Sequence, residues 1–135
     1  MGDRLKHIDT SGEGGVGIGI RGASNITVHT PNVRECWGDI IYVGQLNNII
    51  NCKNIVIKNA YLKRNRRDGI SIISVDGLIL ENCYAGYTDG TAPFCGINFE
   101  ANNPSCVMKN INVTNAKTEN NLGNGIQIGT KRMLG

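Results

Sequence analysis

The chain has 135 residues, a formal net charge of +3 and 40% hydrophobic residues, and Gly, Ile and Asn each occur 18 times. The length allows one ordinary domain, the apolar fraction argues against disorder, and the near balance of charges gives little support to nucleic-acid binding. Because Asn and Gly favour turns and Ile favours strands, a helical bundle or an alternating α/β fold is disfavoured.

A short phrase in which two apolar residues flank one other residue returns along the whole chain, usually opened by Gly. Successive copies start 23, 29, 27 and 29 residues apart, which is the period of a solenoid rather than that of a hairpin meander. We predict a strand at each copy, in residues 17–20, 40–43, 69–72, 96–99 and 125–128.

A second phrase with alternating apolar residues follows each of the first four copies, in residues 25–28, 54–57, 77–80 and 110–113. The offset between the two phrases runs 8, 14, 8 and 14 residues, which predicts six-residue insertions near 45–53 and 101–109, at one corner of two coils. Asn59, Asn82 and Asn115 each stand two residues after such a strand. We expect them to stack as a hydrogen-bonded ladder, although three unrelated turn asparagines remain the alternative.

Three stretches carry a resemblance to a known family: CWGDIIYVG at 36–44, RRDGISII at 66–73 and GINFEANNP at 96–104. They resemble phrases of bacterial and phage repeat proteins in the pectate-lyase-like superfamily, which includes polysaccharide lyases, glycoside hydrolases and phage tail spikes. The resemblance implies an all-β fold, a right-handed parallel β-helix of about five coils over residues 1–135, with no capping helix evident. The chain departs from the family phrases at Ile40, Asn98 and Ala101, where Gly, Asp and Pro are usual.

In such a helix, alternate residues of each strand point inward and should stack as the core. The inward positions of the first phrase are Ile18, Ile20, Ile41, Val43, Ile70, Ile72, Ile97, Phe99, Ile126 and Ile128. The outward positions form two columns, one of Gly19, Tyr42, Ser71, Asn98 and Gln127, and one of Arg21, Gly44, Ile73, Glu100 and Gly129. We interpret this face as a sugar-binding groove with Arg21, Tyr42, Ser71, Asn98 and Gln127 as substrate-binding residues; a solvated sheet face is the alternative.

Glycoside hydrolysis needs two carboxyl groups, one of them with a raised pKa. Asp39 and Asp68 precede the first strand of successive coils, so stacking should bring them close and push one pKa upward. Glu100 follows one coil later, at the other end of its strand. We predict these three as catalytic residues, while caps on backbone N–H groups remain the alternative for Asp39 and Asp68.

A lyase would instead need a base near the substrate, and residues 63–67 form the densest basic cluster. A solvated corner is the ordinary explanation of such a run. The acidic residues are spread singly and the five cysteines form no C-x-x-C pair, so we predict no metal, no cofactor and five buried free thiols.

The combined prediction is a carbohydrate-active module that binds an extended polysaccharide and cleaves it, by hydrolysis rather than elimination. The alternative is a non-catalytic structural or glycan-binding segment of a tail-spike-like or adhesin-like protein. The expected partner is a glycan, with no nucleic acid and no membrane, and the missing caps suggest a fragment of a longer solenoid or association as a trimer or end to end. The start MGDRLKH lacks the apolar stretch of a signal peptide. An extracellular or virion location would then require a longer protein.

Overall fold

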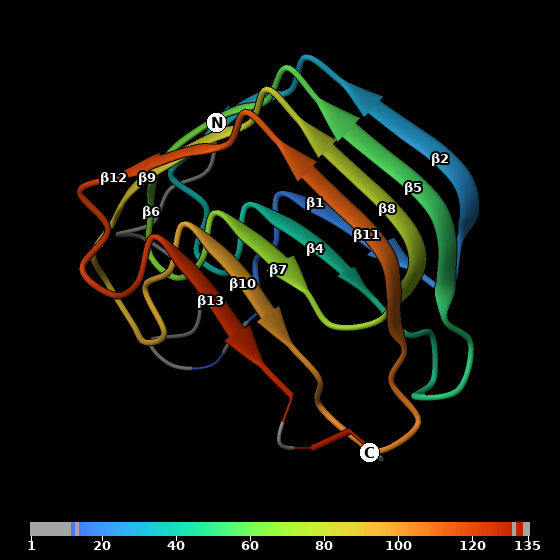
Figure 1. The fold of residues 1–135 in the computed structure, drawn as a ribbon. Coiled ribbons are helices and arrows are strands. Elements are labelled where there is room, and N and C mark those ends of the chain that lie inside the picture. The colour runs from blue at the N-terminus through green and yellow to red at the C-terminus, as the bar shows by residue number, and fades with distance from the viewer. Residues whose placement is uncertain (1–11, 13, 131, 134–135) are drawn as a thin grey trace.

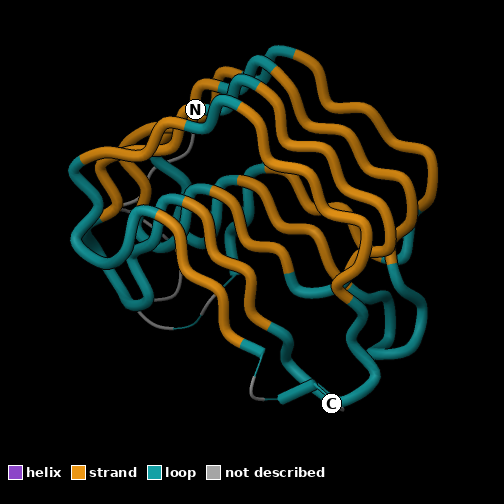
Figure 2. Tube along the Cα trace, viewed as in Figure 1, coloured by secondary structure: helices purple, strands orange, loops and turns teal. Residues whose placement is uncertain are grey.

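The computed structural model describes residues 12, 14–130, 132 and 133. The N-terminal segment considered above for a signal peptide lies outside these residues. Within them the chain forms thirteen strands and no helix, and the strands wind into a stack of coils with three parallel sheets (Figures 1 and 2). No described helix is therefore long and apolar enough to cross a membrane.

Each coil contributes one strand to each sheet, and the described residues make four complete coils and the first strand of a fifth. Sheet A contains β1 (Ile18–Arg21), β4 (Ile41–Gly44), β7 (Ile70–Ile72), β10 (Ile97–Glu100) and β13 (Ile126–Gly129). Sheet B contains β2 (Ser24–His29), β5 (Cys52–Lys58), β8 (Val75–Glu81) and β11 (Met108–Thr114). Sheet C contains β3 (Asn32–Arg34), β6 (Tyr61–Asn65), β9 (Tyr84–Thr88) and β12 (Lys117–Glu119). The predicted parallel β-helix is confirmed.

The register of sheet A is the one that the repeated phrase predicts. Tyr42 pairs with Gly19 on one side and with Ser71 on the other, and Asn98 pairs with Ser71 and Gln127. Side chains of one column therefore follow one another at the spacing of neighbouring strands, about 4.8 Å. This register brings residues that are some 30 positions apart in the chain into contact.

The core lies between the three sheets and is built from the inward isoleucines, leucines and valines. Ile41, Ile70 and Ile97 are completely buried in one column, as predicted. Ile126 and Ile128 were predicted in the same core but are 48% and 73% exposed. The reason is that β13 is an edge strand of sheet A, paired only with β10.

The corners of the coils are made by residues with a left-handed backbone, which recur in columns. The corner after sheet B uses Thr30, Asn59, Asn82 and Asn115, with φ between 53° and 56°. Asn82 donates to the Oδ1 of Asn59 at 3.2 Å, and Asn115 donates to the Oδ1 of Asn82 at 2.7 Å. The predicted asparagine ladder is confirmed, and Asn suits the position because it tolerates this backbone.

The two predicted insertions are loops between sheets A and B, in residues 45–51 and 101–107. They belong to the second and fourth coils, yet they meet across the third: Gln45 donates to the Oγ of Ser105 at 3.0 Å, and Ser105 donates to the carbonyl of Asn48 at 3.0 Å. The third coil turns directly between the same sheets, which leaves room for this contact. All five cysteines are free and buried, as predicted.

Sheet C was not predicted. Its strands have three to five residues and carry mostly polar or charged side chains, such as Lys117-Thr118-Glu119 in β12. Only one or two side chains of each strand face the core, so no apolar alternation marks them. They become strands because the coils on either side supply backbone hydrogen-bond partners.

Candidate functional site

A polar cavity of about 250 Å³ lies on the outer face of sheet A. All three predicted acids, Asp39, Asp68 and Glu100, line it. Of the predicted binding residues, Tyr42, Ser71 and Asn98 line it, whereas Arg21 and Gln127 do not. The cavity extends from the residues that precede β4 and β7 to the end of β10, so it follows the direction of the strands.

Asp39 lies at the start of the second coil and is buried, with 6% exposure. Its Oδ1 accepts the backbone N–H of Asp68 at 3.1 Å and lies 3.5 Å from the Nε of Arg67. Burial raises the pKa of Asp39, against the lowering effect of this N–H and of the Arg67 guanidinium. The alternative interpretation as a backbone cap is thus confirmed for Asp39.

Asp68 occupies the equivalent position one coil later and is 1% exposed. Its Oδ1 accepts the backbone N–H of Cys95 at 2.8 Å, and its Oδ2 accepts hydrogen bonds from Ser71 and Asn98, both at 3.1 Å. Burial, and secondly the negative charge of Asp39, raise the pKa of Asp68 to about 6. Asp68 therefore caps a turn and is also the perturbed carboxyl that the stacking of the two acids predicted.

Glu100 ends β10 and is partly exposed, unlike the two aspartates. The Nδ2 of Asn98 lies 3.3 Å from the Oε2 of Glu100 and 3.1 Å from the Oδ2 of Asp68, so these two oxygens are at most about 6.4 Å apart. Asn98, which stands where the family phrases have Asp, thus connects the carboxyl groups of neighbouring coils.

Ser71 and Asn98 are each only 2% exposed, which corrects the expectation that their column is an open face. Asp68 accepts a hydrogen bond from each of them and Glu100 accepts one from Asn98, so neighbouring carboxyl groups pack against both side chains. Gln127 donates to the Oδ1 of Asn98 at 3.2 Å and accepts from Asn124 at 2.8 Å. Gln127 therefore orients Asn98 from outside the cavity.

Tyr42 supplies the aromatic part of the cavity wall, and Arg21 lies behind it. The Arg21 guanidinium is 4.6 Å from the centroid of the Tyr42 ring. The ring also lies over Gly44, where an added Cβ would be 2.6 Å from the Cε1 of Tyr42. Gly44 thus makes room for the ring, and Arg21 fixes it by a cation–π contact without lining the cavity.

The basic cluster 63–67 does not form one patch. Arg67 lines the cavity and donates to the carbonyl of Ala92 at 2.9 Å, whereas Arg66 lies over the ring of Trp37 at 4.1 Å. Lys63 and Arg64 lie on or beside the outer face of sheet C. Two further lining residues, Asn102 and Arg132, carry no repeat signal and were missed, because loops and not strands bring them to the cavity.

Among the described residues, no group of three or more His, Cys, Asp or Glu side chains is arranged to hold a metal ion. The functional groups that line the cavity are three carboxyl groups, two guanidinium groups, amides, a hydroxyl group and one phenol ring.

Comparison with known proteins finds two bacterial relatives. Over 114 residues the chain is 32% identical to the uncharacterized protein YclG of Bacillus subtilis (strain 168), covering 74% of this chain and 20% of that protein. Over 116 residues it is 29% identical to the SPbeta prophage-derived uncharacterized protein YorA of the same organism, with the same two coverages. The chain therefore spans about a fifth of the length of the curated relatives it matches. No protein-family profile and no solved structure matches it.

Proposed function

We propose that the chain is a carbohydrate-active module of the pectate-lyase-like kind and that the cavity on sheet A binds a segment of an extended polysaccharide. The observation that carries this proposal is the set of rigidly held polar groups in the cavity. Asp68, Asn98 and Glu100 fix one another by hydrogen bonds, so the amide and carboxyl groups are oriented before a ligand arrives. Fixed polar groups beside the aromatic ring of Tyr42 suit the hydroxyl groups and the ring faces of sugars.

The comparisons support this proposal only indirectly. One relative is described as prophage-derived, which fits a protein that meets bacterial polysaccharides. The relatives are about five times longer than the matched segment, so a larger protein can supply further substrate contacts.

Hydrolysis is a second candidate function, favoured by the unlike environments of Asp68 and Glu100. A pKa of about 6 suits Asp68 to donate a proton to the glycosidic oxygen as its bond to the anomeric carbon breaks. Glu100, which is more exposed, would attack the anomeric carbon and later be displaced by water. The separation of at most about 6.4 Å is below the roughly 6.5–9.5 Å typical of inverting enzymes, so hydrolysis should retain the anomeric configuration.

The test is incubation of the purified chain with bacterial capsular and plant polysaccharides, with binding measured by affinity electrophoresis. Reducing ends and the absorbance of unsaturated uronates report hydrolysis and elimination separately. We expect binding, and reducing ends without absorbance. Glu100→Gln should abolish cleavage while leaving the fold intact by circular dichroism. Asp68→Asn should shift or remove the alkaline limb of the pH profile, because Asp68 must be protonated to act as the acid.

Glu81→Gln is the matched control, because Glu81 ends β8 on sheet B and is exposed there. It should bind and cleave as the parent chain does. Binding without cleavage would reject hydrolysis and keep the glycan site. A folded chain that neither binds nor cleaves any polysaccharide would contradict the proposal in favour of a structural segment.

A further inference from the structure

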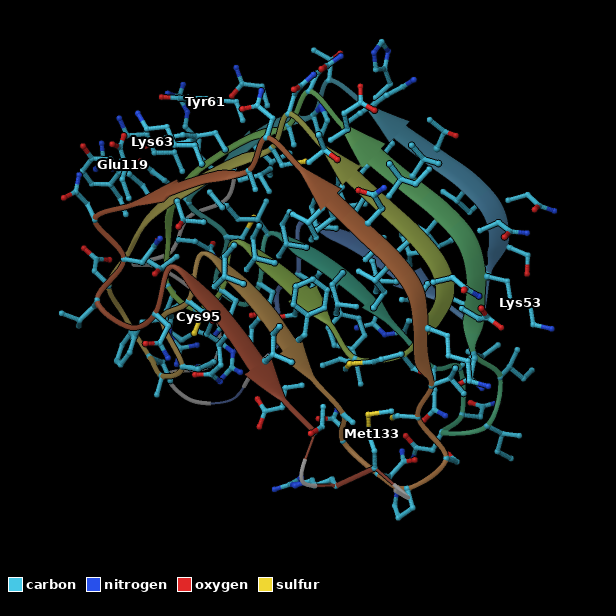
Figure 3. The ribbon with its side chains drawn as sticks, viewed as in Figure 1. Lys53, Tyr61, Lys63, Cys95, Glu119 and Met133 are labelled. Carbon is cyan, nitrogen blue, oxygen red and sulfur yellow. The ribbon has the colours of Figure 1, made fainter. Side chains whose placement is uncertain are left out.

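The outer face of sheet C carries a second concentration of polar side chains, away from the cavity on sheet A. Figure 3 shows Tyr61, Lys63 and Glu119 gathered on this face, with Lys53 on the opposite side of the molecule. The register places Arg34, Lys63, Gly86 and Glu119 in one column, and Asn32, Tyr61, Tyr84 and Lys117 in the next. We call this surface the sheet C face.

Positive charge exceeds negative charge on this face. Its cations are Arg34, Lys63 and Lys117, together with Arg64 at the adjoining corner, and its carboxylates are Glu119 and, at the same corner, Glu35. The Nε of Arg64 lies 3.5 Å from Glu35, and the Nζ of Lys117 lies 3.2 Å from Glu119. These two pairs leave an excess of two positive charges, so the face is complementary to an acidic ligand.

The tyrosines of this face contact one another and neighbouring charged side chains. Tyr61 and Tyr84 stack with their ring centroids 4.8 Å apart and an interplanar angle of 14°. The Nζ of Lys117 is 5.7 Å from the centroid of Tyr84, on the next coil along. Tyr84 also donates to the Oε1 of Glu119 at 2.8 Å. Tyr84 thus has a neighbour on each side of its ring, whereas Tyr61 is still 45% exposed.

Lys63 is held by a residue with an unusual backbone. Its Nζ lies 4.6 Å from the centroid of the Tyr87 ring, and Tyr87 has φ of 61°. A left-handed backbone is costly for a bulky aromatic residue, whereas Asn120, the equivalent residue one coil later, is suited to it. The strained Tyr87 thus holds the ammonium group of Lys63 at its ring.

We propose that the sheet C face binds an acidic polysaccharide, whose carboxylate or sulfate groups contact Arg34, Lys63 and Lys117. The glycan would run along the axis of the helix, because Arg34 and Lys63 stand in one column on neighbouring coils, about 4.8 Å apart along the axis, and Lys117 lies two coils beyond Lys63. A nucleic acid fits less well, since unpaired bases bind by stacking on free aromatic faces. Tyr84 has a neighbour on each side, and Tyr61 offers only the side away from Tyr84. This surface is separate from the cavity, so the proposal does not depend on the function assigned to the cavity.

The test measures binding of the parent chain to polygalacturonate, dextran sulfate, neutral dextran and single-stranded DNA at low and at physiological ionic strength. We expect both acidic glycans to bind, more tightly at low salt, and neutral dextran to be left unbound by this face. The double variant Arg34→Gln/Lys63→Gln should lose about tenfold in affinity for both acidic glycans.

Lys53→Gln is the matched control, because Lys53 is an exposed lysine on the outer face of sheet B. An equal loss in Lys53→Gln would show diffuse attraction and overturn the proposal. Absence of binding by the folded parent chain at low salt would also overturn it. Tighter binding of DNA than of both acidic glycans, weakened by the double variant, would reassign the face to nucleic acid.

Discussion

Asp39 accepts the backbone N–H of Asp68 through its Oδ1 at 3.1 Å. The side chain that precedes β4 therefore caps the backbone at the equivalent position of the next coil, before β7. Both aspartates are buried, and each carboxyl also lines the cavity on sheet A. The same two groups thus hold the turn between coils and set the electrostatics of the candidate site. Changes made to them will alter stability as well as binding.

The pH dependence of stability follows from this arrangement. Burial and Asp39 raise the pKa of Asp68 to about 6, so the folded state binds a proton more tightly than the unfolded chain does. This contribution to stability is fully present below the unfolded pKa of about 3.9 and is lost as the pH rises through about 6. We expect the free energy of unfolding to fall by up to about 3 kcal/mol between about pH 4 and about pH 7.5.

Urea denaturation across this pH range measures the effect. Asp68→Asn should flatten the dependence, because the titrating group is gone, whereas Glu81→Gln should preserve it. A stability that rises between about pH 5 and about pH 7 in the parent chain would contradict the raised pKa of Asp68.

Two substitutions of Asn82 should separate the stability that its hydrogen bonds contribute from the cost of backbone strain. Asn82 donates to Asn59, accepts from Asn115 and has φ of 53°. Asn82→Ala removes both side-chain hydrogen bonds and also strains the backbone, and should cost roughly 2 kcal/mol. Asn82→Gly removes the bonds but tolerates the backbone, so it should cost about 1 kcal/mol less than Asn82→Ala in thermal or urea unfolding. Equal losses would show that backbone strain plays no part.

Relief of backbone strain at Tyr87 should raise the free energy of unfolding while lowering the affinity for an acidic glycan. Tyr87→Asn places a residue that tolerates the left-handed conformation at this corner and should raise the free energy of unfolding by about 1 kcal/mol. The same change removes the ring beside Lys63 and should weaken polygalacturonate binding. Calorimetry and a binding assay on one preparation measure both effects. Lower stability in Tyr87→Asn would show that contacts of the ring outweigh the strain.

Equivalent isoleucines on different coils should differ in their contribution to stability. Ile72 is completely buried, whereas Ile128, in the same column, is 73% exposed on the edge strand β13. Ile72→Ala should cost roughly 3–4 kcal/mol, and Ile128→Ala less than about 1 kcal/mol. Urea unfolding of both variants measures the difference, and a large loss in Ile128→Ala would mean that this end is covered in solution.

An exposed apolar surface at the same edge also predicts self-association. A cavity of about 510 Å³ there is lined by Phe99, Met108 and Ile128, among other apolar residues. Light scattering should show a mass above that of one chain at high concentration, and Ile128→Lys should lower it, because a charge at an apolar contact opposes association. A single-chain mass for the parent at every concentration would contradict this prediction.

The sequence by itself determined the coils, the register and the corners. Ile41, Ile70 and Ile97 recur with the period of a coil and are all buried, and Asn59, Asn82 and Asn115 mark the same corner and form a ladder. Such features are set locally, because strand alternation and left-handed turns depend on the residue types present at fixed spacing. The three carboxyl groups at the cavity were found in the same way, from their place relative to the repeated phrase.

Only the tertiary structure decided how these residues are surrounded. Ser71 and Asn98 were expected on an open face but are buried, because their exposure depends on side chains contributed by neighbouring coils. The strands of sheet C exist because adjacent coils offer hydrogen-bond partners, and their tyrosines and lysines meet only once the coils are stacked. Periodicity reports which way a side chain points, whereas burial, pKa and charge complementarity are set by contacts between distant parts of the chain.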